Sequence, residues 1–149
     1  MFIGVDAGTS VVKAVGFGFE GKIASKSEYS VPTRSSAPGY AEQNLDEVLD
    51  AVGRAVRDVF SDYHRTVELL SITAQGGGLW LMDCHGLPIR PTVIWSDGRA
   101  ADVVEQWMTD GTSDEAVRLN GNMPFSGSAA ALIRHFELHE QVSLKRATT

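Results

Sequence analysis

The sequence predicts an α/β fold with a mixed sheet whose first strands are antiparallel and whose faces are flanked by helices. Residues 2–7, 11–18 and 22–31 are rich in β-branched and aromatic residues and are separated by short turns, so antiparallel pairing is expected. Apolar residues at helical spacing follow over 45–60. The apolar run 69–75 then predicts a buried strand.

The helix expected from residue 45 is the clearest single element. Asn44 stands at the position of an N-cap and Glu47 follows three residues later, which is the pattern of a capping box. The apolar residues that define the helical face are Leu45, Val48, Leu49, Val52, Ala55, Val56, Val59 and Phe60. A 3.6-residue period this sustained predicts an amphipathic helix packed against the sheet.

The remainder of the chain predicts two more strands and then helices. Residues 79–83 and 91–95 have strand-like apolar patterns, with a turn between them at 83–88. The expected helices are 100–108, 114–120 and 128–139, the middle one having the weakest pattern.

Composition limits the class of protein and its partners. The 149 residues, 43% of them hydrophobic, are enough for one core. A formal net charge of -6 argues against nucleic acid or an anionic membrane as partner. No window approaches the roughly 18 apolar residues of a membrane span. The single cysteine, Cys84, and a start without a leader pattern predict a reduced, cytoplasmic protein.

The turn "DAGTS", between the first two expected strands, is the first candidate site. Successive N–H groups and Gly8 can form a concavity for phosphate, and the hydroxyls of Thr9 and Ser10 add donors. Asp6 would repel phosphate directly, so its expected role is to hold Mg²⁺, largely through water. Lys13 would place a cation nearby. The structural alternative is that these residues only make a turn, since the stretch is short.

Two later segments are further candidates, each with a structural alternative. In "AQGGG", Gln75, Gly76 and Gly77 would let a small ligand approach the backbone, although three glycines also suit a loose connection. In "WSDGRA", Asp97 and Arg99 are candidate substrate residues, but the residues alone favour a structural role. Ser96 or Asp97 can cap the helix that follows, and Arg99 can support its start.

Four segments in this order resemble the N-terminal end of the FGGY family of carbohydrate kinases. They are "IGVDAGTSVVKAV" at 3–15, "GYAEQN" at 39–44, "SITAQGGGLWLMD" at 71–83 and "LPIRPTVIWSDGRA" at 87–100. The element order is also similar to the ribonuclease H-like core of the superfamily of sugar kinases, heat-shock ATPases and actin. Within the family, the sequence of these segments is nearest to the kinases of erythritol and L-xylulose-type sugars.

The resemblance implies ATP-dependent phosphorylation of a sugar or polyol of the pentulose or tetritol class. Asp6 would then be the metal-linked acid, and Gly8, Thr9, Ser10 and Lys13 would line the phosphates of ATP with Mg²⁺. The substrate-side residues would be Gln75, Gly76, Gly77, Asp97 and Arg99.

Two departures from the family pattern shape the expectations. Gly76 and Gly77 stand where relatives often carry polar groups, which predicts weaker sugar binding. The family's general base and its C-terminal ATP-binding domain lie further downstream than residue 149, so residues 1–149 correspond to the front part of the kinase N-terminal domain. We therefore expect little activity from this chain alone, and self-association through uncovered apolar faces. A non-catalytic module with weak nucleotide or sugar binding is the alternative.

Overall fold

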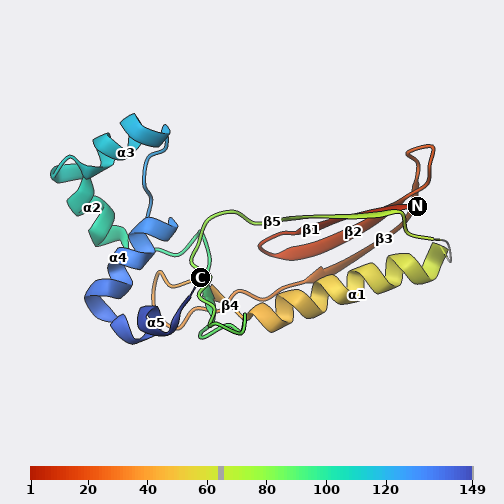
Figure 1. Ribbon diagram of the computed structural model, residues 1–149, viewed down its shortest axis with the longest axis horizontal. Coiled ribbons are helices and arrows are strands. Elements are labelled where there is room, and N and C mark those ends of the chain that lie inside the picture. Colours follow the sequence, from red (N-terminus) through yellow and green to blue (C-terminus); the bar gives the residue numbers. More distant parts are fainter. Residues whose placement is uncertain (64–65, 149) are drawn as a thin grey trace. The chain divides into compact units, whose positions relative to one another are not determined.

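The computed structural model describes residues 1–63 and 66–148 and divides the chain into two compact units (Figure 1). The first unit comprises residues 1–33 and 43–75, and the second comprises 34–42 and 76–149. Each unit has its own cluster of buried apolar side chains, whereas the chain length alone predicted one core. The two clusters share no member, because the apolar residues up to Val59 pack together and those from Leu79 onward pack together.

The first unit is built on a four-stranded mixed sheet. Its strands, in spatial order, are β3 (Ile23–Ser30), β2 (Val11–Phe17), β1 (Phe2–Ala7) and β5 (Leu69–Ala74). The pairs β1–β2 and β2–β3 are antiparallel, and β1–β5 is parallel. The predicted mixed sheet with antiparallel first strands is therefore confirmed, with strand ends within about one residue of those expected.

Helix α1 (Leu45–Tyr63) covers one face of this sheet, against β1, β2 and β3 (Figure 1). The predicted N-cap is confirmed, because the Asn44 Oδ1 accepts a hydrogen bond from the Asp46 N–H at 2.8 Å. Leu49 and Phe60 are exposed, contrary to the expected face, since each lies about 100° around the helix from a buried neighbour. The buried residues of this interface are Ile3, Val5, Ala7, Val12, Ala14, Val48, Ala51, Ala55 and Val59.

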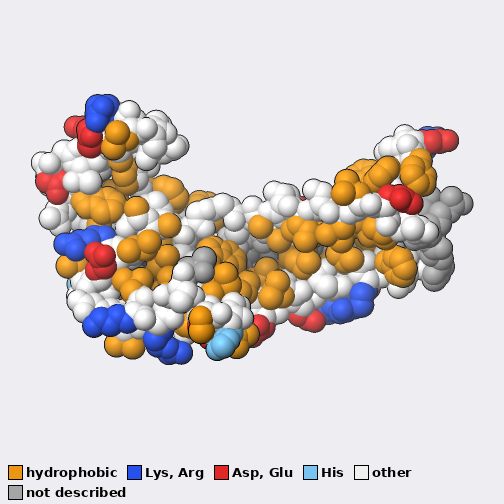
Figure 2. Space-filling view, in the orientation of Figure 1, with side chains coloured by type: hydrophobic (Ala, Val, Ile, Leu, Met, Phe, Trp, Pro, Cys, Tyr) orange, Lys and Arg blue, Asp and Glu red, His pale blue; other side chains and the backbone are white. Residues whose placement is uncertain are grey.

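Strand β5 is present as predicted, but the expectation that it is buried is wrong. All six of its residues are exposed, including Leu69 at 58% and Ile72 at 55%. The reason is positional: β5 is the edge strand of the sheet, and α1 packs over the other three strands. Hydrophobic side chains are correspondingly visible over the strands of the first unit in Figure 2.

We predict that β5 makes the chain self-associate. Its sequence, LLSITA, is uncharged and mostly apolar, and an exposed edge of this kind is a template for pairing with another strand. Sedimentation velocity should show a concentration-dependent increase in mass, and Ile72→Lys should suppress it. The matched control, Ser61→Lys on the exposed surface of α1, should leave the association unchanged. A monodisperse monomer for the unmodified chain would contradict the prediction.

The second unit is mainly helical. The predicted helices are confirmed as α2 (Ala101–Thr109), α3 (Thr112–Asn120) and α4 (Ala129–His139). Helix α5 (Gln141–Arg146) and strand β4 (Glu42–Gln43) were not predicted, because such short elements carry little periodic signal. Strand β4 pairs with β6 (Thr92–Val93). In the described part of the chain, no helix is long and apolar enough to cross a membrane.

The predicted strand at 79–83 is wrong, and the one at 91–95 shrinks to the two residues of β6. Only isolated bridges join Leu79 to Val93 and Met82 to Pro88. The apolar residues of these two segments pack on helices α2 and α4 instead of in a sheet. The turn at 83–88 is confirmed. The buried residues of this core are Leu79, Leu81, Val93, Ala100, Val103, Ala131, Leu132 and Phe136.

Candidate functional site

The turn between β1 and β2, residues 8–10, is fixed through its carbonyl oxygens. The Thr9 carbonyl accepts a hydrogen bond from the Gln43 Nε2 at 2.6 Å, and the Ser10 carbonyl accepts one from the Val31 N–H at 2.9 Å. In a planar trans peptide the C=O and the following N–H point in opposite directions. Because the Thr9 carbonyl is held toward the buried Gln43, the Ser10 N–H is directed to the opposite side.

Asp6 lies on the face of the sheet opposite α1. Side chains alternate along β1, so Ile3, Val5 and Ala7 are buried while Asp6 is exposed. Lys13 is its directly opposed residue on β2, and Thr73 is its partner on β5. Asp6, Lys13 and Thr73 line an open depression of about 380 Å³. The carboxylate is therefore accessible from solvent.

Gly8 leaves the space beside this carboxylate clear. A Cβ at position 8 would lie 2.9 Å from the Val11 carbonyl oxygen and 3.9 Å from each carboxylate oxygen of Asp6. A larger residue would therefore clash with the backbone and crowd Asp6. The close approach of backbone to ligand that the sequence suggested for Gly8 is compatible with this geometry.

The five residues predicted to bind ATP and its metal all lie in the first unit, at or beside the turn. Thr9 is also joined to the substrate-side candidate Gln75, whose Oε1 accepts a hydrogen bond from the Thr9 hydroxyl at 3.2 Å. Among the described residues, no group of three or more His, Cys, Asp or Glu could hold a metal. Asp6 as a lone carboxylate fits Mg²⁺, which takes one or two carboxylates and completes its shell with water and phosphate oxygens.

The glycine segment that follows β5 begins the second unit. Gly78 has a φ of +83°, and a Cβ there would lie 2.4 Å from the Val93 carbonyl oxygen. Glycine is thus required at position 78 by the chain's own packing, so this part of the segment is not the loose connection of the structural alternative. Gly76 is different, because a Cβ there would meet nothing within 4 Å.

Two exposed aromatic residues adjoin Gly77, and sequence reasoning did not single them out. A Cβ at position 77 would lie 3.2 Å from the Trp95 Cβ and 3.6 Å from the Phe125 Cζ. Trp80 adds an N–H···O bond of 3.3 Å from its Nε1 to the Gly77 carbonyl. The positions 77, 95 and 125 share no spacing rule, so only the fold could bring them together. Trp95 lies within the "WSDGRA" segment, which was the one signal available.

Asp97 does not cap α2, so that expectation is wrong. The helix starts at Ala101, and Ala100 before it makes no side-chain cap. Asp97 is fully buried, with 0% exposure, and instead accepts hydrogen bonds from the Ala41 N–H at 2.6 Å and from Arg99. The carboxylate therefore ties the segment before α2 to the segment 34–42.

Arg99 is the centre of a buried ion-pair network. Its side chain is 3% exposed and donates from Nε and Nη2 to both oxygens of Asp97, at 2.8 and 2.9 Å. Nη2 also lies 2.8 Å from Glu42, which pairs in turn with Arg90 at 2.9 Å. The Arg99 guanidinium stacks 4.0 Å from the ring centroid of Tyr40. Arg99 and Asp97 are therefore each other's main ion-pair partner.

This network predicts acid sensitivity of the second unit. Burial disfavours the ionised form of Asp97, but hydrogen bonds from Arg99 and the Ala41 N–H outweigh it and hold its pKa below the usual 3.8. A carboxyl whose folded-state pKa is depressed contributes stability above its unfolded pKa and loses it as pH falls through the folded pKa. The urea midpoint should therefore decrease as pH falls below about 4.

Tryptophan fluorescence reports this loss selectively, because Trp80, Trp95 and Trp107 all lie in the second unit. Asp97→Asn should flatten the acid dependence, whereas Asp114→Asn on the exposed start of α3 should not. An acid dependence unchanged in Asp97→Asn would count against the assignment.

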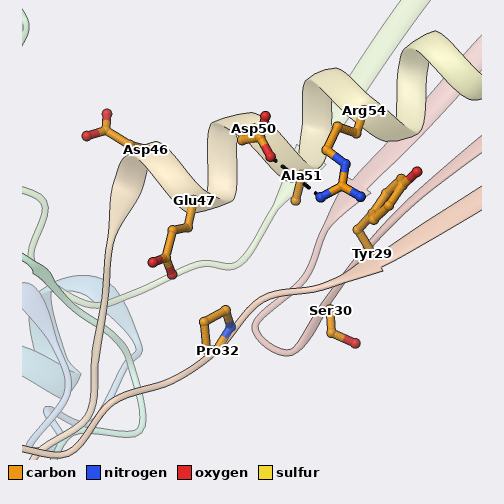
Figure 3. A pocket seen from close by; sticks show the side chains of 8 residues that line it. All are labelled: Tyr29, Ser30, Pro32, Asp46, Glu47, Asp50, Ala51 and Arg54. Atoms are coloured by element: carbon orange, nitrogen blue, oxygen red, sulfur yellow. Dashed lines mark ion pairs between the residues drawn. The ribbon is translucent and has the colours of Figure 1, made fainter.

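A separate acidic cavity of about 460 Å³ lies in the first unit, where β3 ends and α1 begins (Figure 3). Arg54 pairs with Asp50 at 3.8 Å and lies over the ring of Tyr29, 4.1 Å from its centroid. The other residues that line the cavity are Ser30, Pro32, Asp46, Glu47 and Ala51. The cavity contains none of the residues predicted to bind phosphate or sugar.

A family model matches the chain over its whole length, and known proteins match most of it. Residues 1–149 match the family model described as the FGGY family of carbohydrate kinases, N-terminal domain. A probable L-xylulose kinase from Pasteurella multocida is 28% identical over 150 residues, which cover 97% of this chain and 31% of that protein. Erythritol kinase from Brucella abortus is 33% identical over 107 residues, which cover 70% of this chain and 21% of that protein.

Solved structures match the fold. A ligand-bound xylulose kinase from Lactobacillus acidophilus has a TM-score of 0.95 at 19% sequence identity, over 99% of this chain and 30% of that one. At this identity the likeness shows the fold alone. The chain spans less than a third of the length of each of these three proteins.

Proposed function

Because the chain belongs to the FGGY family of carbohydrate kinases, we propose that it contributes to ATP-dependent phosphorylation of a sugar or polyol. The acceptor is of the pentulose or tetritol class, since the relatives include proteins named L-xylulose kinase and erythritol kinase. Residues 1–149 would form part of the N-terminal domain of such a kinase, and it would work in the cytoplasm.

The observation that carries this proposal is the anchored turn beside an accessible carboxylate. The Thr9 and Ser10 carbonyls are both engaged by donors from other elements, which leaves the turn in one conformation. Phosphoryl transfer depends mainly on positioning and on charge neutralisation, so a fixed array of donors next to a metal-binding acid is the apparatus it needs.

Each residue of the turn then has a specific task. The Ser10 N–H and hydroxyl would donate to phosphate oxygens, and Gly8 would allow the phosphates to approach the backbone. Thr9 would line the phosphates while its one hydroxyl hydrogen stays donated to Gln75, which holds the turn. Lys13, across from Asp6 on β2, would contribute a positive charge. Asp6 would hold Mg²⁺ through water, and the bound ion would supply neutralisation of the phosphate charge.

The sugar side is assigned to Gln75 in the first unit and, in the second unit, to Gly76, Gly77 and the aromatic residues that adjoin Gly77. Gln75 offers an amide that can donate and accept, and Gly76 has free space beside its backbone. Trp95 and Phe125 would provide apolar surface against the carbon skeleton of the acceptor. Asp97 and Arg99, which are buried and paired with each other, would contribute to the substrate side by fixing the backbone segment that follows Trp95.

Isothermal titration with ATP and Mg²⁺ tests the proposal. Asp6→Ala should weaken binding by about 10- to 150-fold, the range expected for loss of an interaction with a charged group. Thr9→Ala should also weaken it, because it removes the hydrogen bond that ties the turn to Gln75. The matched control is Asp114→Ala, which removes an exposed carboxylate in α3. Equal heats for the unmodified chain and both variants would refute the phosphate assignment.

A non-catalytic binding module is the second candidate, favoured by the lack of polar side chains at Gly76 and Gly77. Titration with L-xylulose and erythritol in the presence of saturating MgATP separates the two. Because little activity is expected from residues 1–149 alone, binding is compared with that of Asp6→Ala and Thr9→Ala. Binding that both substitutions weaken supports the kinase, and sugar or nucleotide binding that neither changes supports the module. The self-association predicted for β5 would make either form a homo-oligomer.

A further inference from the structure

Gln43 is a buried polar residue that the candidate site does not yet include. It is 1% exposed and belongs to the first unit, at the end of β4 just before α1. Its Nε2 donates to the Thr9 carbonyl at 2.6 Å and to the Thr33 Oγ1 at 3.3 Å. Its Oε1 accepts a hydrogen bond from the Gln75 Nε2 at 2.8 Å. Both ends of the amide are therefore used.

These contacts close a ring with two residues of the candidate site. Gln75, through its own amide, donates to Gln43 and accepts from the Thr9 hydroxyl at 3.2 Å. Gln75 is anchored as well by its backbone, since its N–H donates to the Ala7 carbonyl at 3.1 Å. Turning either amide by 180° would bring like atoms together, so the ring has one consistent orientation.

We propose that Gln43 is a positioning residue that holds the phosphate-binding turn and Gln75 in a single arrangement. It contacts neither ligand and acts through Thr9 and Gln75. By holding the Thr9 carbonyl inward, it directs the Ser10 N–H toward the side where the phosphates would bind. By accepting from the Gln75 Nε2, it leaves the orientation of that amide fixed. The inference rests on the proposed function for the roles of Thr9 and Gln75.

The variant Gln43→Glu isolates this role because it keeps the shape of the side chain. A carboxylate can still accept from the Gln75 amide and from the Thr33 hydroxyl. It cannot donate to the Thr9 carbonyl, and its second oxygen would repel that carbonyl at 2.6 Å. The turn should therefore be released while the other contacts persist. Gln43→Met removes all three hydrogen bonds without adding charge, and it replaces the glutamate variant in the test if that variant does not fold.

The test combines ¹⁵N amide spectra with calorimetry on the whole chain. In Gln43→Glu, the amide resonances of Gly8, Thr9 and Ser10 should shift, and MgATP affinity should fall at least about tenfold. Lowering the pH to about 5 should return these resonances toward their original positions, because a protonated carboxyl can donate and burial raises its pKa. A purely structural role would not give this rescue.

Two controls complete the design. Gln106→Glu makes the same change on the exposed surface of α2, and Thr33→Val removes only the 3.3 Å contact. In both variants, the amide resonances of the turn and the MgATP affinity should be unchanged. Unshifted turn resonances in Gln43→Glu and Gln43→Met would overturn the inference. If the unmodified chain binds no MgATP, the proposed function fails, and the turn resonances alone decide whether Gln43 positions the turn.

Discussion

Replacing Arg99 by methionine is expected to destabilise the second unit by about 3–5 kcal/mol, the cost of removing one partner from a buried ion pair. The change leaves the fully buried Asp97 without its bidentate partner and deprives Glu42 of one of its two arginines. The methionine would keep much of the packing volume against Tyr40, so the loss is mainly electrostatic. Urea unfolding followed by tryptophan fluorescence measures it, since all tryptophans lie in this unit.

An exposed ion pair provides the control. Arg134 pairs with Glu137 at 3.1 Å on the surface of α4, with both side chains about half exposed. Arg134→Met should cost less than about 1 kcal/mol. The double variant Arg99→Met with Asp97→Asn should be less destabilised than the sum of the single variants, because the unpaired charge is removed. Equal losses for Arg99→Met and Arg134→Met would contradict a buried network.

Gly127→Ala is expected to destabilise the same unit by about 3 kcal/mol and to displace Trp95. A Cβ at position 127 would lie 1.7 Å from the Trp95 carbonyl oxygen and 2.9 Å from its Cα. Because these are backbone atoms, the clash is relieved only by moving the chain, which places the variant at the upper end of the cost of overpacking. The Gly127 carbonyl also accepts from the Gly78 N–H at 2.9 Å, so the glycine segment should move with it.

The matched control for this clash is Gly76→Ala, which adds the same methyl group where nothing lies within 4 Å. It should change the unfolding free energy by less than about 1 kcal/mol. The emission maximum of tryptophan should shift in Gly127→Ala and stay fixed in Gly76→Ala. A stable Gly127→Ala variant with unchanged emission would mean that the backbone contact at Trp95 is not as close as described.

Much of the fold was predictable because its signals are local. The β-branched and aromatic residues of 2–7 and the helical period of 45–60 each identified an element, and the short turns required antiparallel pairing. The ribonuclease H-like fold suggested by the order of elements is confirmed by the solved sugar kinases of the same fold. The predicted phosphate residues are close together for the same reason: Asp6 to Lys13 span one hairpin.

Features that depend on non-local packing were not predictable. The apolar run of β5 looked buried, yet its exposure depends on which strands α1 covers. The apolar residues at 79–83 looked like a strand, yet they pack on helices and make only isolated bridges. Asp97 looked like a helix cap, yet in the fold it pairs with the Ala41 N–H and with Arg99 instead.

By itself, the sequence determined the antiparallel first strands and the identity of the turn at residues 8–10, because each of these depends on patterns within a short stretch of chain. It also indicated the family, through four short segments in a fixed order. Only the tertiary structure decided that Gln43 reaches Thr9 and Gln75, that Trp95 and Phe125 adjoin Gly77, and that Asp97 is paired internally. Most of these contacts join residues more than 15 positions apart, and the Asp97 pair depends on burial. Both conditions are met only once the chain has folded.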